Sequence, residues 1–154
     1  MLRRRLAWYG GLILLAACDP AYYMRVSNPL RPAASLACLD SAAAASGTVA
    51  VISKGHAKPG HEKFEIRFQE ATALPLAASL EFAKGPASDS SVVTSIRYRW
   101  IGGSTRLDPG AESNARAQAA TVLAELRAKC APTATPVVEC RYEGLRPGNC
   151  RAPA

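Results

Sequence analysis

The sequence predicts an α+β two-layer sandwich, in which a four- to five-stranded, mainly antiparallel sheet carries two helices on one face. The first observation is a change of apolar period along the chain, which gives the element order α-β-β-β-β-α-β. The second is the shortness of the connections between strands, because parallel neighbours need crossovers of about a dozen residues or more. The third is that the alternating strands offer one apolar face, which two helices can cover. We expect the opposite face of the sheet to be solvated.

Two segments have helical spacing. The first helix is expected over 32–45, which begins with a proline suited to the first helical position, and Gly47 can end it. The second is expected to begin after Asp108, an N-cap residue, and to run to about Lys129. Glu112 lies in its first turn, where the helix dipole favours a negative charge.

Five segments predict strands. Residues 48–53 are apolar and β-branched, and residues 64–68 alternate between apolar and charged side chains. Residues 76–82 also alternate, although their alanines and leucines suit a helix as well. The fourth strand is expected over 92–101 and the last, after the second helix, over 137–143.

The first residues of the chain carry a separate signal. Three arginines at 3–5 precede a short apolar run at 6–15, which continues into Ala16-Ala17-Cys18. The run is too short for a membrane-spanning helix, which needs about 20 apolar residues. A positive start, a short apolar run and small residues before a cysteine make this segment resemble the signal peptide of a bacterial lipoprotein.

The resemblance implies cleavage between Ala17 and Cys18, with residues 1–17 removed as the signal peptide. It also implies that the Cys18 thiol receives a diacylglycerol and that the new N-terminus is acylated, with palmitate as a typical chain. Several acyl chains give a stable anchor where one gives only marginal binding. The expected location is therefore the periplasmic side of a bacterial membrane. Asp19 favours the inner over the outer membrane under enteric-type sorting.

The mature chain is expected to hold one domain. Removing 17 residues from 154 leaves 137, and the net charge of +7 loses three arginines to become +4. Residues 18–31 are expected to form the lipidated N-terminus and a tether, because Pro20 and Pro29 interrupt them. The single α+β domain is then expected over 32–154. Its mild positive charge favours anionic headgroups or wall polymers as partners, and no Lys/Arg-rich block points to nucleic acid.

Besides Cys18, the chain has an even number of cysteines in a compartment that we expect to be oxidising. These four are Cys38, Cys130, Cys140 and Cys150. We therefore expect two disulfides; the alternative, a metal site, usually shows a close pair such as C-x-x-C. A chain reversal near Leu145 would bring Cys140 opposite Cys150, which leaves Cys38 and Cys130 to join the two helices.

No motif predicts a catalytic site, a metal site or a cofactor. His56 and His61, with Glu62, could supply zinc ligands, but spacing across a Pro-Gly turn fixes no geometry, and two solvated loop histidines are the simpler interpretation. Neither H-E-x-x-H nor G-x-S-x-G is present. Carboxylates that could pair as glycosidase acids are Glu62, Glu65, Glu70 and Glu81.

The predicted polar face of the sheet has a weak basic bias. Its five cations are Lys63, Arg67, Arg97, Arg99 and Arg141. Its three carboxylates are Glu65, Glu81 and Glu139. This face is either an ordinary solvated surface or a platform for anionic headgroups, lipopolysaccharide or peptidoglycan.

These observations predict a non-enzymatic, periplasm-facing lipoprotein with a binding or accessory role in the bacterial cell envelope. Its expected partners are the membrane, through acyl chains on Cys18, and an envelope protein or an anionic glycan or lipid. Two alternatives stay open: an envelope hydrolase acting on wall polymer or lipid, and a purely structural spacer. A spacer predicts a flat surface without a pocket.

Overall fold

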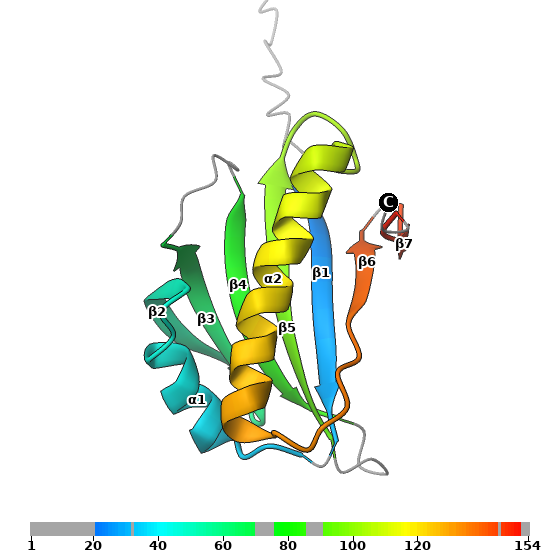
Figure 1. Cartoon of the computed structure of the whole chain (residues 1–154). Helices are drawn as coiled ribbons and strands as arrows, with labels where there is room; N and C mark the ends of the chain where they lie inside the picture. Colours follow the sequence, from blue (N-terminus) through cyan, green and yellow to red (C-terminus); the bar gives the residue numbers. More distant parts are fainter. Residues whose placement is uncertain (1–20, 32, 70–75, 86–90, 145, 152–154) are drawn as a thin grey trace, which may run out of the picture.

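The computed structural model describes residues 21–31, 33–69, 76–85, 91–144 and 146–151. Within them, one antiparallel sheet and two helices form two layers, with both helices on the same face of the sheet (Figure 1). The helices are α1 (Leu36–Ala44) and α2 (Pro109–Cys130). The strands are β1 (Ala21–Leu30), β2 (Val49–Lys58), β3 (His61–Phe68), β4 (Ala77–Lys84), β5 (Val92–Ile101), β6 (Glu139–Glu143) and β7 (Gly148–Asn149). The predicted α+β class is confirmed.

The sheet has seven strands in the order β2-β3-β4-β5-β1-β6-β7, more than the four or five expected. Strands β2 to β5 form the predicted antiparallel meander. The segment at 76–82, for which a helix was the alternative, forms β4, with Leu80 and Phe82 fully buried. The expected connection after residue 53 is mostly strand, because β2 continues to Lys58 and turns at Gly60, whose φ is 75°.

The prediction that residues 18–31 form a tether is wrong for 21–30. These residues form β1, which pairs along its length with β5 and over part of its length with β6. Met24 and Val26 are fully buried, so the segment has the period of two that a strand in a sheet requires. Pro29 is tolerated there because the ladder with β6 ends at Ser27.

The core lies between the sheet and the two helices. Helix α2 buries an apolar stripe, which consists of Ala115, Ala119, Val122, Leu123 and Leu126. Its N-cap is the predicted one, since the Asp108 side chain accepts a hydrogen bond from the amide of Ala111 at 2.9 Å. Helix α1 begins later than expected because Ser35 is its N-cap and accepts a hydrogen bond from the amide of Cys38.

Two disulfides connect the cysteines as the layout predicts. Cys38 on α1 pairs with Cys130 at the end of α2, with the two Cα atoms 5.8 Å apart; we call this the helix disulfide. Cys140 on β6 pairs with Cys150, with a Cα separation of 5.4 Å; we call this the C-terminal disulfide. Among the described residues, no helix combines the length and the apolar character needed to cross a membrane.

Candidate anionic-ligand site

The sheet face opposite the helices, here called the polar face, carries all five of the predicted basic residues. Residues directly opposite one another on antiparallel strands project to the same face. One row across β3, β4, β5, β1 and β6 contains Glu65, Ser79, Arg97, Arg25 and Arg141. Three arginines are therefore consecutive in this row, and like charges so arranged repel unless carboxylates compensate them.

The centre of the polar face is buried, contrary to the expectation of a solvated surface. Glu81 is 3% exposed and Ser95 is 2% exposed. Arg25 compensates the buried charge, since its Nη2 lies 3.3 Å from Glu81 Oε2, and its Nε lies 2.8 Å from Glu143 Oε1. The second oxygen of Glu143 lies 3.0 Å from Arg97 Nε. Two carboxylates and two arginines therefore form one connected network in the middle of the sheet.

Sequence reasoning missed Arg25 because it placed that residue in a tether. The signal that could have found it is its position between the apolar Met24 and Val26, which puts it on the other face of a strand. The aromatic neighbour Tyr23 has a role there as well, because the Arg97 guanidinium lies 4.0 Å from the centroid of the Tyr23 ring. Arg97 is thus held by one carboxylate and one aromatic ring.

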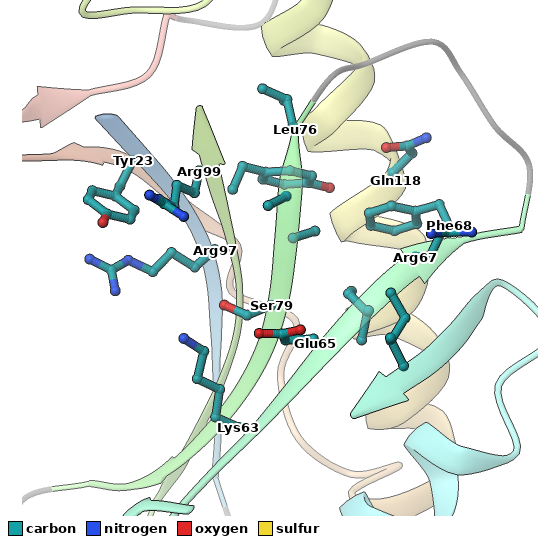
Figure 2. Close-up of a pocket in the computed structure, with 15 residues that line it drawn as sticks. Tyr23, Lys63, Glu65, Arg67, Phe68, Leu76, Ser79, Arg97, Arg99 and Gln118 are labelled. Atoms are coloured by element: carbon teal, nitrogen blue, oxygen red, sulfur yellow. The ribbon is translucent and has the colours of Figure 1, made fainter. Parts of the chain in front are cut away.

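A cavity of about 610 Å³ opens beside this network (Figure 2). Four of the predicted cations line this basic cavity: Lys63, Arg67, Arg97 and Arg99. Glu65 is the one carboxylate among its lining residues. Lys63, Arg67 and Arg99 make no ion pair or hydrogen bond with any described residue. Arg141 is on the same face but outside the lining.

The basic cavity extends from the polar face toward the helix layer. The ladder between β3 and β4 ends at the pair Ile66–Ala78, so the strand ends beyond it separate. The residues around this opening include Phe68 from β3, Tyr98 from β5 and Gln118 from α2. In Figure 2, Phe68 and Gln118 are drawn on the α2 side of β4, with Arg67 beside Phe68, whereas Lys63, Arg97, Arg99 and the ring of Tyr23 are drawn on the other side.

The walls toward α2 are largely apolar. Phe68 stacks on Tyr98 with ring centroids 6.0 Å apart and planes 13° apart. Ile52, 56% exposed, and the half-buried Leu76 also line the cavity. The Tyr98 hydroxyl is already used, since it donates a hydrogen bond to the carbonyl oxygen of Ala115 at 2.8 Å. The cavity therefore has a cationic side and an apolar side.

The histidine–carboxylate cluster of the sequence is divided by the sheet. His61 is the first residue of β3 and not part of a loop, and its Nε2 lies 3.7 Å from Glu81 Oε2 on the polar face. Glu62, the next residue of the strand, projects to the opposite face, where Oε2 lies 3.7 Å from Lys54 Nζ. The side chain of His56 lies outside the described part of the chain. The described residues hold no group of three or more His, Cys, Asp or Glu side chains suited to a metal ion.

Ser79 and His61 contact the same carboxylate. The Ser79 hydroxyl donates a hydrogen bond to Glu81 Oε1 at 3.3 Å, and His61 approaches the other oxygen. A serine nucleophile needs a base within hydrogen-bond reach and a third group that orients that base. Here the carboxylate lies between the hydroxyl and the imidazole, so the arrangement gives Ser79 no imidazole base.

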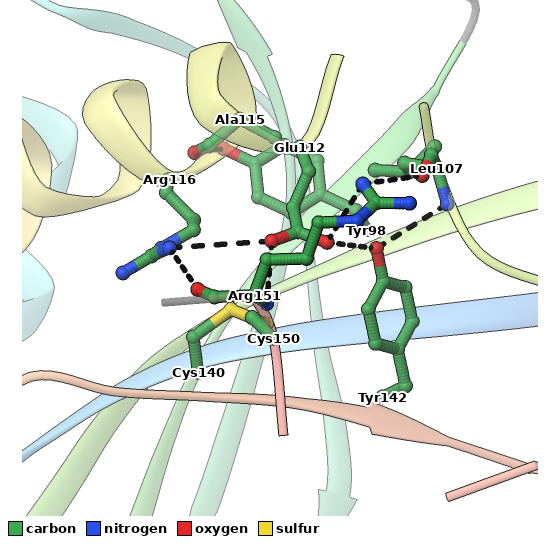
Figure 3. Close-up of a disulfide and its surroundings, with 9 residues drawn as sticks. All are labelled: Tyr98, Leu107, Glu112, Ala115, Arg116, Cys140, Tyr142, Cys150 and Arg151. Atoms are coloured by element: carbon green, nitrogen blue, oxygen red, sulfur yellow. Dashed lines mark hydrogen bonds and ion pairs between the residues drawn. A yellow bond between two sulfur atoms is a disulfide. The ribbon is translucent and has the colours of Figure 1, made fainter. Parts of the chain in front are cut away.

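A second buried carboxylate, Glu112, fastens the C-terminal segment to the start of α2 (Figure 3). It is 2% exposed and accepts hydrogen bonds from the Tyr142 hydroxyl at 2.6 Å and from the backbone amide of Arg151 at 2.9 Å. The Arg151 guanidinium adds an ion pair, with Nη1 3.5 Å from Oε2. Burial, and then the hydrogen bond to Glu112, raise the pKa of the Tyr142 hydroxyl. These contacts have a structural role. From the sequence, we expected only a favourable interaction of Glu112 with the dipole of the second helix.

The proposed cleavage and lipidation positions, Ala17 and Cys18, lie outside the described residues. No protein-family model matches the chain. No curated protein and no solved structure is significantly similar to it.

Proposed function

We propose that this protein is a lipid-anchored component of the bacterial cell envelope that binds an anionic ligand in its basic cavity, on the periplasmic side of the membrane. The anchor is proposed from the lipoprotein-like residues up to Cys18. The two disulfides are consistent with an oxidising compartment. The observation that carries the binding role is the set of uncompensated cations in a concave site.

The charges in the cavity favour an anion. Glu143 and the Tyr23 ring already hold Arg97, which leaves three cations, Lys63, Arg67 and Arg99, with Glu65 as the one lining carboxylate. Like charges that line a cleft with low-dielectric walls raise the local concentration of the opposite ion. Arginine also presents a planar set of donors that matches phosphate and carboxylate groups.

A concave site supports a binding role over that of a spacer, because a spacer requires no cavity. The hydrolase alternative relied on carboxylates or on the histidine pair, and the placement of His61 and Glu62 on opposite faces of the sheet does not favour it. The contacts of Ser79 supply no imidazole base either. We therefore propose binding without catalysis.

The anchor is tested by growing cells with labelled palmitate. We expect label on the wild-type chain and none on the Cys18→Ser variant. A wild-type chain that carries no label, or that keeps residues 1–17 in its mature form, would refute the proposed anchor.

The binding site is tested with butyl phosphate, a small anion whose binding is followed by phosphorus NMR on the full protein in phosphatidylcholine nanodiscs. The double variant Arg67→Gln/Arg99→Gln should bind at least about tenfold more weakly, because hydrogen bonds to charged groups contribute about 1.5–3 kcal/mol each. The matched control is Arg141→Gln, an exposed residue of the same face outside the cavity, which should bind like wild type. Equal affinities for all three proteins would refute the proposed site.

A further inference from the structure

We infer that the ligand of the basic cavity is an anionic amphiphile, whose headgroup contacts the cations and whose hydrocarbon chain passes between β3 and β4 toward α2. This inference rests on the proposed function, namely that the cavity binds an anion. It adds the chemical class of the ligand and the direction in which the ligand lies.

The first argument is that residues from both faces of the sheet line the cavity where the ladder between β3 and β4 ends. Beyond the pair Ile66–Ala78, the ends of β3 and β4 no longer pair, and residues from both faces of the sheet line the same cavity. Arg97 and Arg99 come from the polar face, whereas Phe68 comes from the face that the helices cover. One elongated molecule can therefore contact both sides of the sheet at once.

The second argument is the chemistry of the two ends. The end toward α2 offers Phe68, Tyr98 and Leu76, and the Tyr98 hydroxyl is engaged with the Ala115 carbonyl. A purely hydrophilic anion would satisfy the cations and leave the half-buried Phe68 and Leu76 in contact with water. A ligand with a hydrocarbon chain removes that surface from water, which tightens binding by about fourfold for each methylene that is fully buried.

The third argument is size. Small-molecule sites in proteins are typically cavities of about 300–1,000 Å³ with mostly apolar walls and a few polar groups that orient the ligand. The basic cavity, at about 610 Å³, lies within that range. A phospholipid of the membrane and a free single-chain amphiphile share the required chemistry, so the experiment has to identify the source.

The test compares butyl phosphate with dodecyl phosphate below its critical micelle concentration, on the full protein in phosphatidylcholine nanodiscs with empty discs as the blank. We expect dodecyl phosphate to bind at least about tenfold more tightly than butyl phosphate. Equal affinities for the two phosphates would overturn the inference that the ligand is an amphiphile. If Arg67→Gln/Arg99→Gln still weakened both probes in that case, the proposed function would stand while this inference failed.

A matched pair of variants places the chain in the cavity. Ile52 and Ile101 are each 56% exposed, but only Ile52 lines the basic cavity. Ile52→Ser should weaken dodecyl phosphate binding about fourfold without affecting butyl phosphate, because about one buried methylene equivalent is lost. Ile101→Ser should change neither. Equal behaviour of the two variants toward dodecyl phosphate would overturn the proposed position of the chain.

Native mass spectrometry of the protein purified from membranes in a neutral detergent identifies the source. A bound two-chain phospholipid that is depleted in Arg67→Gln/Arg99→Gln assigns the ligand to the membrane. A single-chain adduct, or none, together with tight dodecyl phosphate binding, assigns it to a soluble amphiphile.

Discussion

Replacing Glu112 by glutamine should destabilise the fold through the contacts that hold its C-terminal segment. The carboxylate, 2% exposed, accepts hydrogen bonds from the Tyr142 hydroxyl and the Arg151 amide and neutralises the Arg151 guanidinium. Glutamine has nearly the same size, but one of its two terminal groups is an amide that only donates. One of the two donors therefore loses its acceptor, and the guanidinium loses its counter-charge.

The expected cost is about 2–3 kcal/mol, since a hydrogen bond to a charged group contributes about 1.5–3 kcal/mol. That is a large fraction of the roughly 5–15 kcal/mol by which a domain is stable. For a chain of this length the melting temperature falls by about 3–4 °C per kcal/mol, so Glu112→Gln should melt about 6–12 °C below wild type.

The assay is thermal and urea unfolding of the purified protein in neutral detergent, followed by circular dichroism. The control is Glu139→Gln, which removes an exposed glutamate without a partner among the described residues and should cost less than about 0.5 kcal/mol. Hydrogen exchange supplies a local measurement, because the Arg151 amide donates to Glu112 and should exchange faster in Glu112→Gln. If the two variants were equally stable and the exchange of that amide were unchanged, the reasoning would be refuted.

Three further predictions concern pH and crosslinks. Burial raises the pKa of Tyr98, so the neutral hydroxyl contributes a stability to the fold that is present below the unfolded pKa of about 10 and is lost as the pH rises above it. Tyr98→Phe should therefore reduce the fall in melting temperature at alkaline pH. An unchanged fall would contradict this. Hydrogen bonds from Thr48 and Ser46 lower the pKa of Glu125, so the associated stability is present above about pH 4.3 and is lost as the pH falls through the lower folded value. The difference in melting temperature between wild type and Glu125→Gln should therefore shrink toward about pH 3, and a constant difference would oppose the prediction. Replacing the cysteines of the helix disulfide, which are 92 positions apart, by serine should cost about 2 kcal/mol more in urea unfolding than replacing those of the C-terminal disulfide, which are 10 apart; the reverse ranking would exclude a dominant loop-entropy effect.

The parts of the fold that could be predicted are those with a local signal. An N-cap at Asp108 and a proline after it act within one helical turn, and α2 begins where they indicate. Alternation over ten residues identified β5 with the observed bounds, Val92–Ile101. The same signal exists in β1, but prolines at 20 and 29 outweighed it in the prediction, although Pro29 lies beyond the ladder with β6.

The candidate site was predicted only as a set of cations on one face. The alternation of charged and apolar residues was enough to place Lys63, Arg97 and Arg99 on that face, because side-chain direction in a strand follows residue parity. It gave no information about which cations are compensated. Arg97 is paired with a glutamate 46 positions away in the chain, and such a pairing depends on strands that are distant in sequence.

By itself, the sequence determined the α+β class, the two helices, the central meander, the even cysteine count and the lipoprotein-like start, because each depends on residues close together in the chain or on composition. Only the tertiary structure decided that β1 lies between β5 and β6, that Glu81 and Glu112 are buried with their partners, and that residues from both faces of the sheet line one cavity. The physical reason is that strand order, register and burial are set by the sum of many long-range contacts, to which no short stretch of sequence contributes a decisive share.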